Sequence, residues 1–426
     1  MRLLYTVVLC LVVPLIVARL MSRGFRERAY RDRISERFGL GTHIGSRRGC
    51  LWVHAASVGE VQAATPIVRA LESRYPGETI LVTTTTPTGA QRAVETFGDS
   101  VVHRYLPFDL PWTMARYLDR VKPRVAIIME TEIWPNLMAL CRAREVPVVL
   151  ANARLSERSA SRYRMFRRLY TPVFRGVAAV AAQSDKDAIR LASIGAPQEC
   201  IDVTGNTKFD VPIPTGLREN AAALRRTWGA TRRVWIAAST HQGEESQILA
   251  AFEQVHNRLP ESLLILVPRH PERFPEAEAL ARRCGLISVL RSQRTTDCTK
   301  AQVYIGDTMG ELLLLYAAAD VAFVGGSLVE IGGHNVLEPA ALGVPVFFGP
   351  HHFNFAEISR QLVEAGGAEI IIDTAHLARS VIRHLEDEDL RSNAGEKGRA
   401  FVKSGRGAWE RVIAMITPHV EGHVTD

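Results

Sequence analysis

The sequence predicts an α/β protein with two doubly wound domains that face a cleft, preceded by an N-terminal membrane anchor helix. Its 426 residues are enough for two domains of about 200 residues, and the apolar content of 47% is ample for two cores. Short apolar runs alternate with amphipathic stretches, which is typical of parallel sheets covered by helices on both faces. A segment rich in glycine and proline interrupts this alternation at 205–216.

The first element is an uncharged apolar stretch at 3–18, interrupted by Pro14. As a helix it spans about 24 Å, less than the roughly 30 Å hydrocarbon core of a bilayer. It is longer than the apolar core of a signal peptide, and no small-residue cleavage site is clear before the arginines that follow. Because Lys and Arg mark the cytoplasmic side, we expect residues 1–20 to be an uncleaved anchor, spanning or deeply embedded, with the rest in the cytoplasm. A buried core helix is the alternative.

The net charge of +7 is concentrated next to this anchor. Residues 19–37 contain seven arginines against three acids, and a second basic cluster lies at 154–175. Their place beside an apolar segment favours an anionic membrane surface over nucleic acid as the partner. The six cysteines form no C-x-x-C pair, which is typical of a reducing compartment and argues against a zinc site. His351 and His352 also lack a plausible third ligand nearby in the sequence, so we expect no metal.

The strands of each domain are expected at short apolar runs. The first domain, at 21–205, has them at 50–55, 79–83, 101–106, 124–129, 147–150 and 177–181. Residues 206–216 form the expected linker. The second domain, at 217–426, has strands at 233–238, 263–267, 303–305, 321–324, 344–348 and 369–372, and its last helix is able to pack back on the first domain. Ligands of such domains bind outside the carboxyl ends of the strands.

The most informative loop is the glycine-rich stretch at 325–350, which follows the strand at 321–324. Glycine pairs lie on both sides of Ser327, and a helix begins near Asn335. A glycine loop before a helix start offers free N–H groups and the positive end of a dipole, which suit a phosphate. Asn335 can cap the helix, and Glu338 can accept from sugar hydroxyls. The alternative is that the glycines only form turns. No G-x-G-x-x-G or P-loop pattern is present.

Polar side chains also follow strands of the first domain. Glu60 occupies the first turn of the helix after the first strand, where the helix dipole alone would favour an acid. A general base needs the same fixed, partly desolvated carboxylate. Glu130 and Glu132 directly follow another strand; one of them can cap a helix, but folding alone does not explain a buried pair. Lys208 lies at the domain link, where it can neutralise a phosphate or a sugar carboxylate.

Three polar turns in the second domain, at 239–245, 267–271 and 307–311, also follow strands. Arg269 is well suited to a phosphate or to stacking on a base. Together with the glycine-rich stretch, these turns indicate one nucleotide pocket. The D-x-D pattern that starts at Asp185 is better explained by helix capping than by metal binding.

Eight motifs across nearly the whole chain resemble the 3-deoxy-D-manno-octulosonic acid (Kdo) transferases of lipopolysaccharide synthesis. They are HAASVGE, METEIWPN, NARLSERS, GNTKFD, STHQGEE, VPRHPERF, GDTMGEL and GGSLVEIGGHNVLEP. The resemblance implies the Rossmann-like two-domain glycosyltransferase-B fold, with the acceptor in the first domain and the donor in the second. It also implies inverting, metal-independent transfer of Kdo from CMP-Kdo to a lipid A precursor (lipid IVA) at the cytoplasmic face of the inner membrane.

The resemblance further implies roles for individual residues. Glu60 would be the base that deprotonates the acceptor hydroxyl, and Glu130 and Lys208 would stabilise the transition state. The residues implied to bind CMP are Pro268, Arg269, Met309, Gly310, Glu311, Asn335, Val336, Leu337 and Glu338, with Ser327 as a further candidate from the glycine-rich stretch. Two alternatives stay open: a nucleotide-sugar 2-epimerase of the same fold, and a non-catalytic membrane-associated protein that binds sugar nucleotides.

Overall fold

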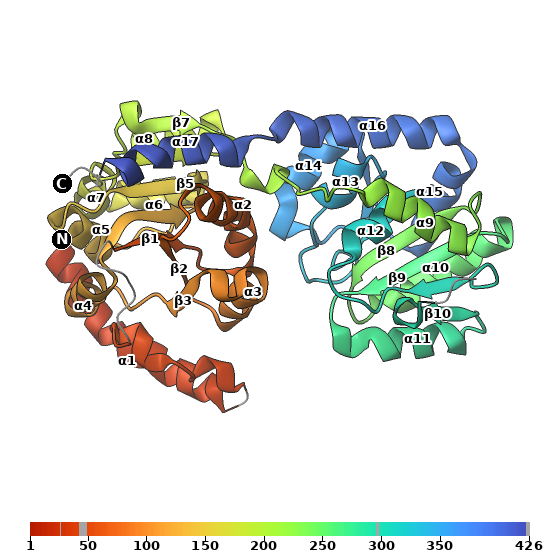
Figure 1. The fold of residues 1–426 in the computed structure, drawn as a ribbon, viewed down its shortest axis with the longest axis horizontal. Coiled ribbons are helices and arrows are strands. Elements are labelled where there is room, and N and C mark those ends of the chain that lie inside the picture. Colours follow the sequence, from red (N-terminus) through yellow and green to blue (C-terminus); the bar gives the residue numbers. More distant parts are fainter. Residues whose placement is uncertain (26, 42–48, 295–297, 423–426) are drawn as a thin grey trace. The chain divides into compact units, whose positions relative to one another are not determined.

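The computed structural model describes residues 1–25, 27–41, 49–294 and 298–422 (Figure 1). The chain forms two compact units: unit 1 comprises Met1–Asp210 and Gly405–Asp426, and unit 2 comprises Val211–Ser404. The sequence-based boundaries differ from this division at the linker, whereas the last helix packs back on the first unit, as the sequence allowed. The start of the expected linker belongs to unit 1, which includes the 3-10 helix η5 (Thr207–Phe209), and the chain returns to unit 1 at Gly405.

Unit 1 is built on a parallel sheet, which within the described residues has seven strands in the order β3-β2-β1-β4-β5-β6-β7. The strands are β1 (Cys50–His54), β2 (Thr79–Thr84), β3 (Val102–Tyr105), β4 (Pro123–Met129), β5 (Val148–Ala153), β6 (Ala179–Ala182) and β7 (Ile201–Val203). The strand order reverses between β1 and β4. Loops that leave two such strands diverge, so the crevice that α/β proteins use for ligands lies at their carboxyl ends.

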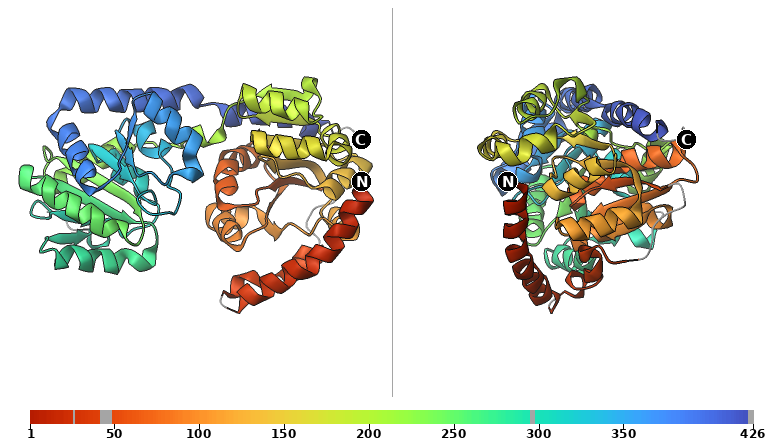
Figure 2. Two further views of the ribbon diagram at one scale, coloured as in Figure 1. Left: turned by 180° about the vertical axis from the view of Figure 1, so that it is seen from behind. Right: turned by 90° about the vertical axis from the view of Figure 1, so that its left-hand side faces the viewer.

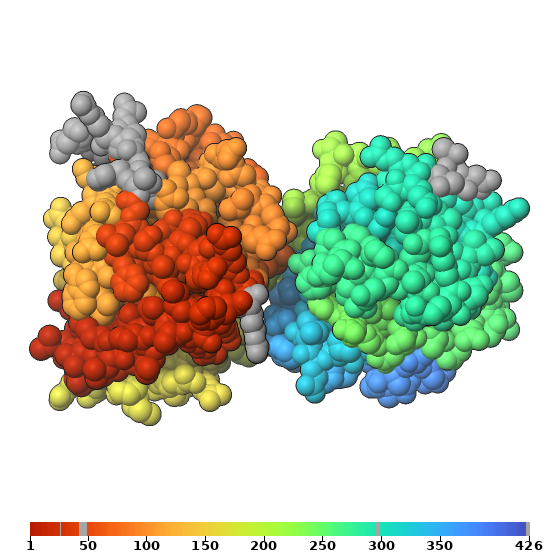
Figure 3. Space-filling view, turned by 90° about the horizontal axis from the view of Figure 1, so that it is seen from below, coloured from red at the N-terminus to blue at the C-terminus, as the bar shows by residue number. Residues whose placement is uncertain are grey.

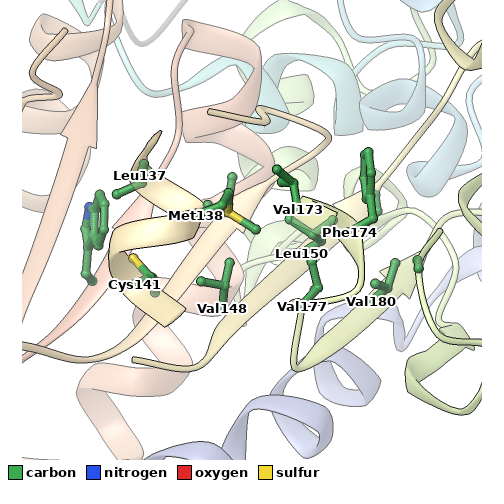
Figure 4. Packing of buried hydrophobic residues seen from close by; sticks show 14 of the residues in the cluster. Leu137, Met138, Cys141, Val148, Leu150, Val173, Phe174, Val177 and Val180 are labelled. Carbon is green, nitrogen blue, oxygen red and sulfur yellow. The ribbon is translucent and has the colours of Figure 1, made fainter. Parts of the chain in front are cut away.

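Helices cover both faces of this sheet. They are α2 (Val58–Arg74), α3 (Pro87–Phe97), α4 (Pro111–Val121), α5 (Pro135–Ala143), α6 (Glu157–Met165), α7 (Arg167–Phe174), α8 (Asp185–Ser193) and α17 (Ala408–Glu421). Short 3-10 helices are η1 (Arg28–Tyr30), η2 (Ile34–Phe38), η3 (Gly98–Ser100) and η4 (Gln198–Cys200). Figure 4 shows part of the apolar core on one face, where side chains of α5 and α7 pack over β5.

The other face carries a second apolar cluster, to which the C-terminal helix α17 contributes. Its buried residues Val412, Ile416 and Val420 pack among side chains of α2 and the central strands. The Arg124 guanidinium also donates to the Val420 carbonyl at 2.6 Å. Unit 1 therefore needs α17, near the C-terminal end of the chain, to complete its core.

The N-terminal helix α1 (Arg2–Gly24) is continuous through Pro14, so the expected interruption does not occur. Within the described residues it is the one helix long and apolar enough to cross a membrane, judged by length and composition alone. It lies along the outside of unit 1 (Figure 2), with Thr6 and Val13 buried against that unit. Of the seven arginines at 19–37, Arg26 lies outside the described residues.

Unit 2 holds the second parallel sheet, whose described strands follow the order β10-β11-β9-β8-β12-β13-β14. They are β8 (Val234–Thr240), β9 (Leu263–Pro268), β10 (Ser288–Leu290), β11 (Val303–Ile305), β12 (Val321–Val324), β13 (Val346–Phe348) and β14 (Ala368–Ile370). The order reverses between β8 and β12, which places the second crevice beside the glycine-rich stretch. The two doubly wound domains predicted from the sequence are thus confirmed.

Unit 2 also has helices on both faces of its sheet, with an apolar cluster under each layer. They are α9 (Leu217–Trp228), α10 (Glu244–Arg258), α11 (Phe274–Arg283), α12 (Leu312–Ala317), α13 (Leu337–Leu342), α14 (Ala356–Glu364), α15 (Thr374–Glu386) and α16 (Glu388–Gly405). Its 3-10 helices are η6 (Pro271–Arg273), η7 (Arg291–Gln293) and η8 (Phe353–Phe355).

Candidate functional site

Glu60 lies in the first turn of α2, directly after β1, and is only 8% exposed. One carboxylate oxygen accepts from the Ala56 N–H at 2.8 Å, and the other accepts from the Ser57 hydroxyl at 2.9 Å. Burial raises the pKa of Glu60 to about 7, and the nearby acids Glu130 and Glu132 add to this rise. A fixed carboxylate that titrates near neutral pH has the properties of a general base.

Glu130 follows β4, the neighbour of β1, and has a left-handed backbone with φ of 54°. Its N–H donates to the Ala151 carbonyl at 2.8 Å, which fixes the turn. The Lys208 ammonium lies 3.8 Å from a carboxylate oxygen of Glu130. The structure therefore brings Glu60, Glu130 and Lys208, predicted from three separate loops, together at the reversal of strand order in unit 1.

Sequence reasoning gave no role to the residues that hold Lys208 in place. The Asn152 side-chain oxygen accepts from the Thr207 N–H at 3.0 Å, and the Thr207 hydroxyl donates to the Ala63 carbonyl at 3.0 Å. The Asn206 side chain accepts from the Lys208 N–H at 3.0 Å. Asn152 is fully buried at the end of β5, so a polar residue inside an apolar strand was the signal that could have marked it.

In unit 2, the first part of the glycine-rich stretch, at 326–328, does not offer the free N–H groups that the sequence led us to expect. The Glu244 carboxylate, fully buried at the start of α10, accepts from the N–H groups of Gly326, Ser327 and Leu328 at 2.6, 2.9 and 2.8 Å. It also accepts from the His241 N–H at 2.9 Å. Four N–H groups therefore donate to one buried carboxylate, so these four donors are not available to an anionic ligand.

The same loop explains why Ser327 is a poor candidate for a ligand contact. Ser327 is fully buried, and its hydroxyl donates to the Val324 carbonyl at 2.6 Å while it accepts from the Gly349 N–H at 2.8 Å. Both hydrogen-bonding functions of the hydroxyl are used within unit 2. These contacts hold the loop to β12 and β13, and the contact of Ser327 with the donor stays a prediction.

Asn335 comes just before Val336, the N-cap residue of α13, and its side-chain oxygen accepts from the Leu337 N–H at 3.1 Å. Its amide group donates to the Glu338 carboxylate at 3.1 Å, so the two polar side chains orient each other. Val336 and Leu337 have buried side chains, so contacts of these two residues with a ligand would come from their backbone.

The other predicted CMP residues follow β9 and β11, which are neighbours in the sheet. Pro268 ends β9, and the Arg269 N–H donates to the Thr240 carbonyl at 2.9 Å, which ties this turn to β8. Met309 is largely exposed, and Gly310 has a left-handed backbone with open space beside it. The structure therefore places these residues at the carboxyl edge of the unit 2 sheet.

Glu311 is held in place by a partner that the sequence did not indicate. Its carboxylate accepts two hydrogen bonds from the Arg291 guanidinium, at 3.0 and 2.8 Å, and another from the Thr308 hydroxyl. The Arg291 guanidinium lowers the pKa of Glu311, so this side chain is a fixed anion at neutral pH.

Sequence reasoning also did not foresee the histidine pair beside this loop. The Nε2 atoms of His241 and His334 are 2.8 Å apart, and the His270 ring lies edge-on to His241. Burial lowers the pKa of His241 to about 4 and that of His334 to about 3, and the Arg269 charge acts in the same direction. Both rings are therefore neutral near pH 7, with one ring as donor and the other as acceptor.

A family model described as 3-deoxy-D-manno-octulosonic-acid transferase (kdotransferase) matches residues 32–211. Over 425 residues, the chain is 42% identical to the 3-deoxy-D-manno-octulosonic acid transferase of Haemophilus influenzae, which covers 99% of this chain and 100% of that protein. The chain belongs to the Kdo transferase family. This Kdo transferase is therefore a glycosyltransferase, and a second model, described as glycosyl transferases group 1, matches residues 295–401 in unit 2.

Two kinds of solved structure are similar to this Kdo transferase: one is similar in sequence over part of the chain, and the other is similar in fold over most of it. The C-terminal CMP-Kdo binding domain of WaaA from Acinetobacter baumannii is 36% identical and covers 45% of this chain and 100% of that one, with a TM-score of 0.43. The match to a UDP-GlcNAc 2-epimerase from Neisseria meningitidis covers 86% of this chain and 99% of the epimerase chain. The two are 13% identical, with a TM-score of 0.58. The latter likeness is one of fold alone, that of glycosyltransferase-B proteins.

Proposed function

We propose that this Kdo transferase moves Kdo from CMP-Kdo to a lipid A precursor (lipid IVA), with inversion and without a metal ion. The observation that carries the proposal is the cluster of Glu60, Glu130 and Lys208 at the strand-order reversal of unit 1. It supplies a base with a pKa near neutrality beside a cation, inside a family whose reaction transfers Kdo.

Glu60 acts as the base in this proposal. Its carboxylate takes the proton of an acceptor hydroxyl while that oxygen forms a bond to the anomeric carbon of Kdo. The bond from this carbon to the phosphate oxygen breaks, and CMP leaves with the electron pair. Attack from the face opposite the leaving phosphate inverts the anomeric centre. The raised pKa of Glu60 supports this role, because a carboxylate with a normal pKa is a weaker base.

Lys208 stabilises negative charge as it develops, and Glu130 positions it through their 3.8 Å contact. On the donor, Arg269 contacts the phosphate of CMP, and Glu311 and Glu338 accept from ribose hydroxyls. The other CMP contacts come from Pro268, Met309, Gly310 and Asn335, and from the backbone of Val336 and Leu337. The leaving group carries a single phosphate, so Arg and Lys side chains are sufficient to stabilise it.

The protein acts at the cytoplasmic side of the inner membrane in this proposal. The exposed apolar surface of α1 and the basic residues that follow it support attachment to an anionic bilayer. A lipid acceptor keeps its acyl chains in that bilayer, so an attached enzyme meets it at a higher effective concentration.

Incubation of the full-length protein with CMP-Kdo and lipid IVA tests the proposal. Mass spectrometry should detect lipid IVA that has gained Kdo, and Glu60→Gln should abolish most of this product. A donor that is altered without transfer would favour an epimerase, and no change in either substrate would favour a binding protein. Activity should persist in EDTA; its loss, with recovery on addition of Mg²⁺, would overturn the metal-free mechanism.

A further inference from the structure

A cavity of about 300 Å³ opens on unit 1 between α5, α7 and the start of α1. Its floor is apolar and includes Met138 of α5 and Leu169 and Val173 of α7. Met138 and Val173 also belong to the core of unit 1, where Figure 4 shows them, so the floor is fixed by packing beneath it. Arg2, Arg142 and Arg168 line the same cavity. None of these residues belongs to the proposed catalytic cluster.

The three arginines are a concentrated positive charge. Within the described part of the chain, no carboxylate lies within ion-pair distance of any of them, whereas nearby Arg144 is paired with Asp119 at 2.8 Å. Arg2 also acts electrostatically on Asp109: burial raises the pKa of this carboxyl to about 6, and the Arg2 charge opposes part of that rise. Its oxygens are already committed, because they accept from the Tyr5 hydroxyl and from two N–H groups at the start of α5. The cavity thus lacks a compensating anion of its own.

Arg2, which lines the cavity, is the first residue of α1, and this helix has an exposed apolar face. Leu3 and Leu11 on this face are 79% and 71% exposed. The opposite face is fastened to unit 1: Tyr5 donates to Asp109 at 3.0 Å, and the Asn136 amide donates to the Thr6 hydroxyl at 3.1 Å. Figure 3 shows the N-terminal part of the chain, in red, at the surface of unit 1. These contacts hold α1 on unit 1 with Leu3 and Leu11 exposed, next to Arg2 of the cavity.

We propose that this cavity binds an anionic glycerophospholipid of the membrane. Arg2, Arg142 and Arg168 hold the headgroup phosphate by charge-assisted hydrogen bonds, and the first methylenes of an acyl chain lie on the apolar floor. The acyl chains continue over the exposed face of α1 into the bilayer. The charge selects an anion, and the apolar floor selects a lipid over inorganic phosphate. The bound lipid fixes the orientation of unit 1 on the membrane, independently of the transfer chemistry.

Titration of the detergent-solubilised, full-length protein with dihexanoyl phosphatidylglycerol, followed by calorimetry, tests the site. Arg142→Gln combined with Arg168→Gln should weaken binding at least tenfold, because charge-assisted contacts are lost. The matched control is Arg158→Gln combined with Arg162→Gln, which removes the same charge from exposed arginines of α6 that do not line the cavity. The control should change the affinity less than threefold. Both double variants should keep their affinity for CMP, which reports on unit 2.

A further variant tests the apolar floor. Ala139→Trp fills the cavity from α5 and leaves all three arginines in place, so it should weaken phosphatidylglycerol binding. Equal losses in the two arginine double variants would show a diffuse basic surface and overturn the proposal. Displacement of the lipid by an equal concentration of inorganic phosphate would show a free-anion site and overturn it as well, as would unchanged lipid binding in all variants.

Discussion

Replacement of Glu60 with Gln should change how the stability of the fold depends on pH. Burial raises the pKa of Glu60 from 4.5 to about 7, so the folded state holds its proton more tightly than the unfolded chain does. The protonated form therefore contributes stability that is fully present below pH 4.5 and is lost as the pH rises through about 7. With these two pKa values, the contribution falls by about 2.5 kcal/mol between pH 5 and pH 8.

Gln keeps the shape and does not titrate in this range, so this contribution disappears in Glu60→Gln. Its oxygen can accept from the Ala56 N–H, and its amide can donate to the Ser57 hydroxyl, which is free to reorient. Relative to wild type, the variant should therefore gain about 2.5 kcal/mol in free energy of unfolding between pH 5 and pH 8. The gain should accompany a loss of transfer activity by about 10² to 10⁴.

Urea unfolding of both proteins in the same detergent at pH 5, 6, 7 and 8 measures this difference. The matched control is Glu95→Gln, which changes an exposed glutamate of α3 and should follow wild type at every pH. The difference in free energy of unfolding between Glu60→Gln and wild type should change with pH. If it stays constant within about 0.5 kcal/mol from about pH 5 to pH 8, the raised pKa of the Glu60 carboxyl is refuted. The assignment of Glu60 as the base would then lose its physical support.

The other predictions concern the pH profile and unit 2. The kcat/KM of wild type should fall about tenfold per pH unit below pH 7, because the Glu60 base must be ionised; a flat profile down to pH 5.5 would contradict this. Glu244→Gln should destabilise unit 2 by about 2 kcal/mol or more in urea unfolding, because one amide cannot accept from four N–H groups, whereas the exposed Glu253→Gln on the same helix should not. Arg269→Ala should raise the Kd for CMP about 10-fold to 100-fold in calorimetry, and Arg283→Ala, exposed on α11, should leave it unchanged.

The sequence predicted most of the fold because the central strands are buried on both faces and appear as continuous apolar runs. It missed β7 and β10, which have only three residues each and no fully buried residue. At the sheet edges, backbone pairing defines the strands more than apolar burial does. The break expected at Pro14 was wrong, since α1 continues through this residue.

The sequence predicted the individual loops of the candidate site, but it did not predict which loops lie close together. Glu60 and Glu130 were recognisable as polar residues after apolar strands. Their proximity, however, depends on β1 and β4 being neighbours in the sheet, and strand order cannot be inferred from local sequence patterns. The prediction that residues 326–328 of the glycine-rich stretch offer free N–H groups was wrong for a related reason. The anion that occupies these N–H groups is Glu244, more than 80 positions earlier in the chain, so no local pattern reveals that the donors are taken.

The return of the chain to unit 1 at Gly405 sets an order of events during synthesis. Every residue of unit 2 is synthesised before α17, so unit 1 still lacks part of its core when the unit 2 sequence is complete. The apolar α1 is made first, long before Val412, Ile416 and Val420 arrive to cover the sheet beneath them. Nascent unit 1 therefore keeps an open apolar face until α17 is made, and the proposed base Glu60 lies in α2, on the sheet face that is covered last. A chain that stops at Ser404 would contain a complete unit 2 beside a permanently unfinished unit 1.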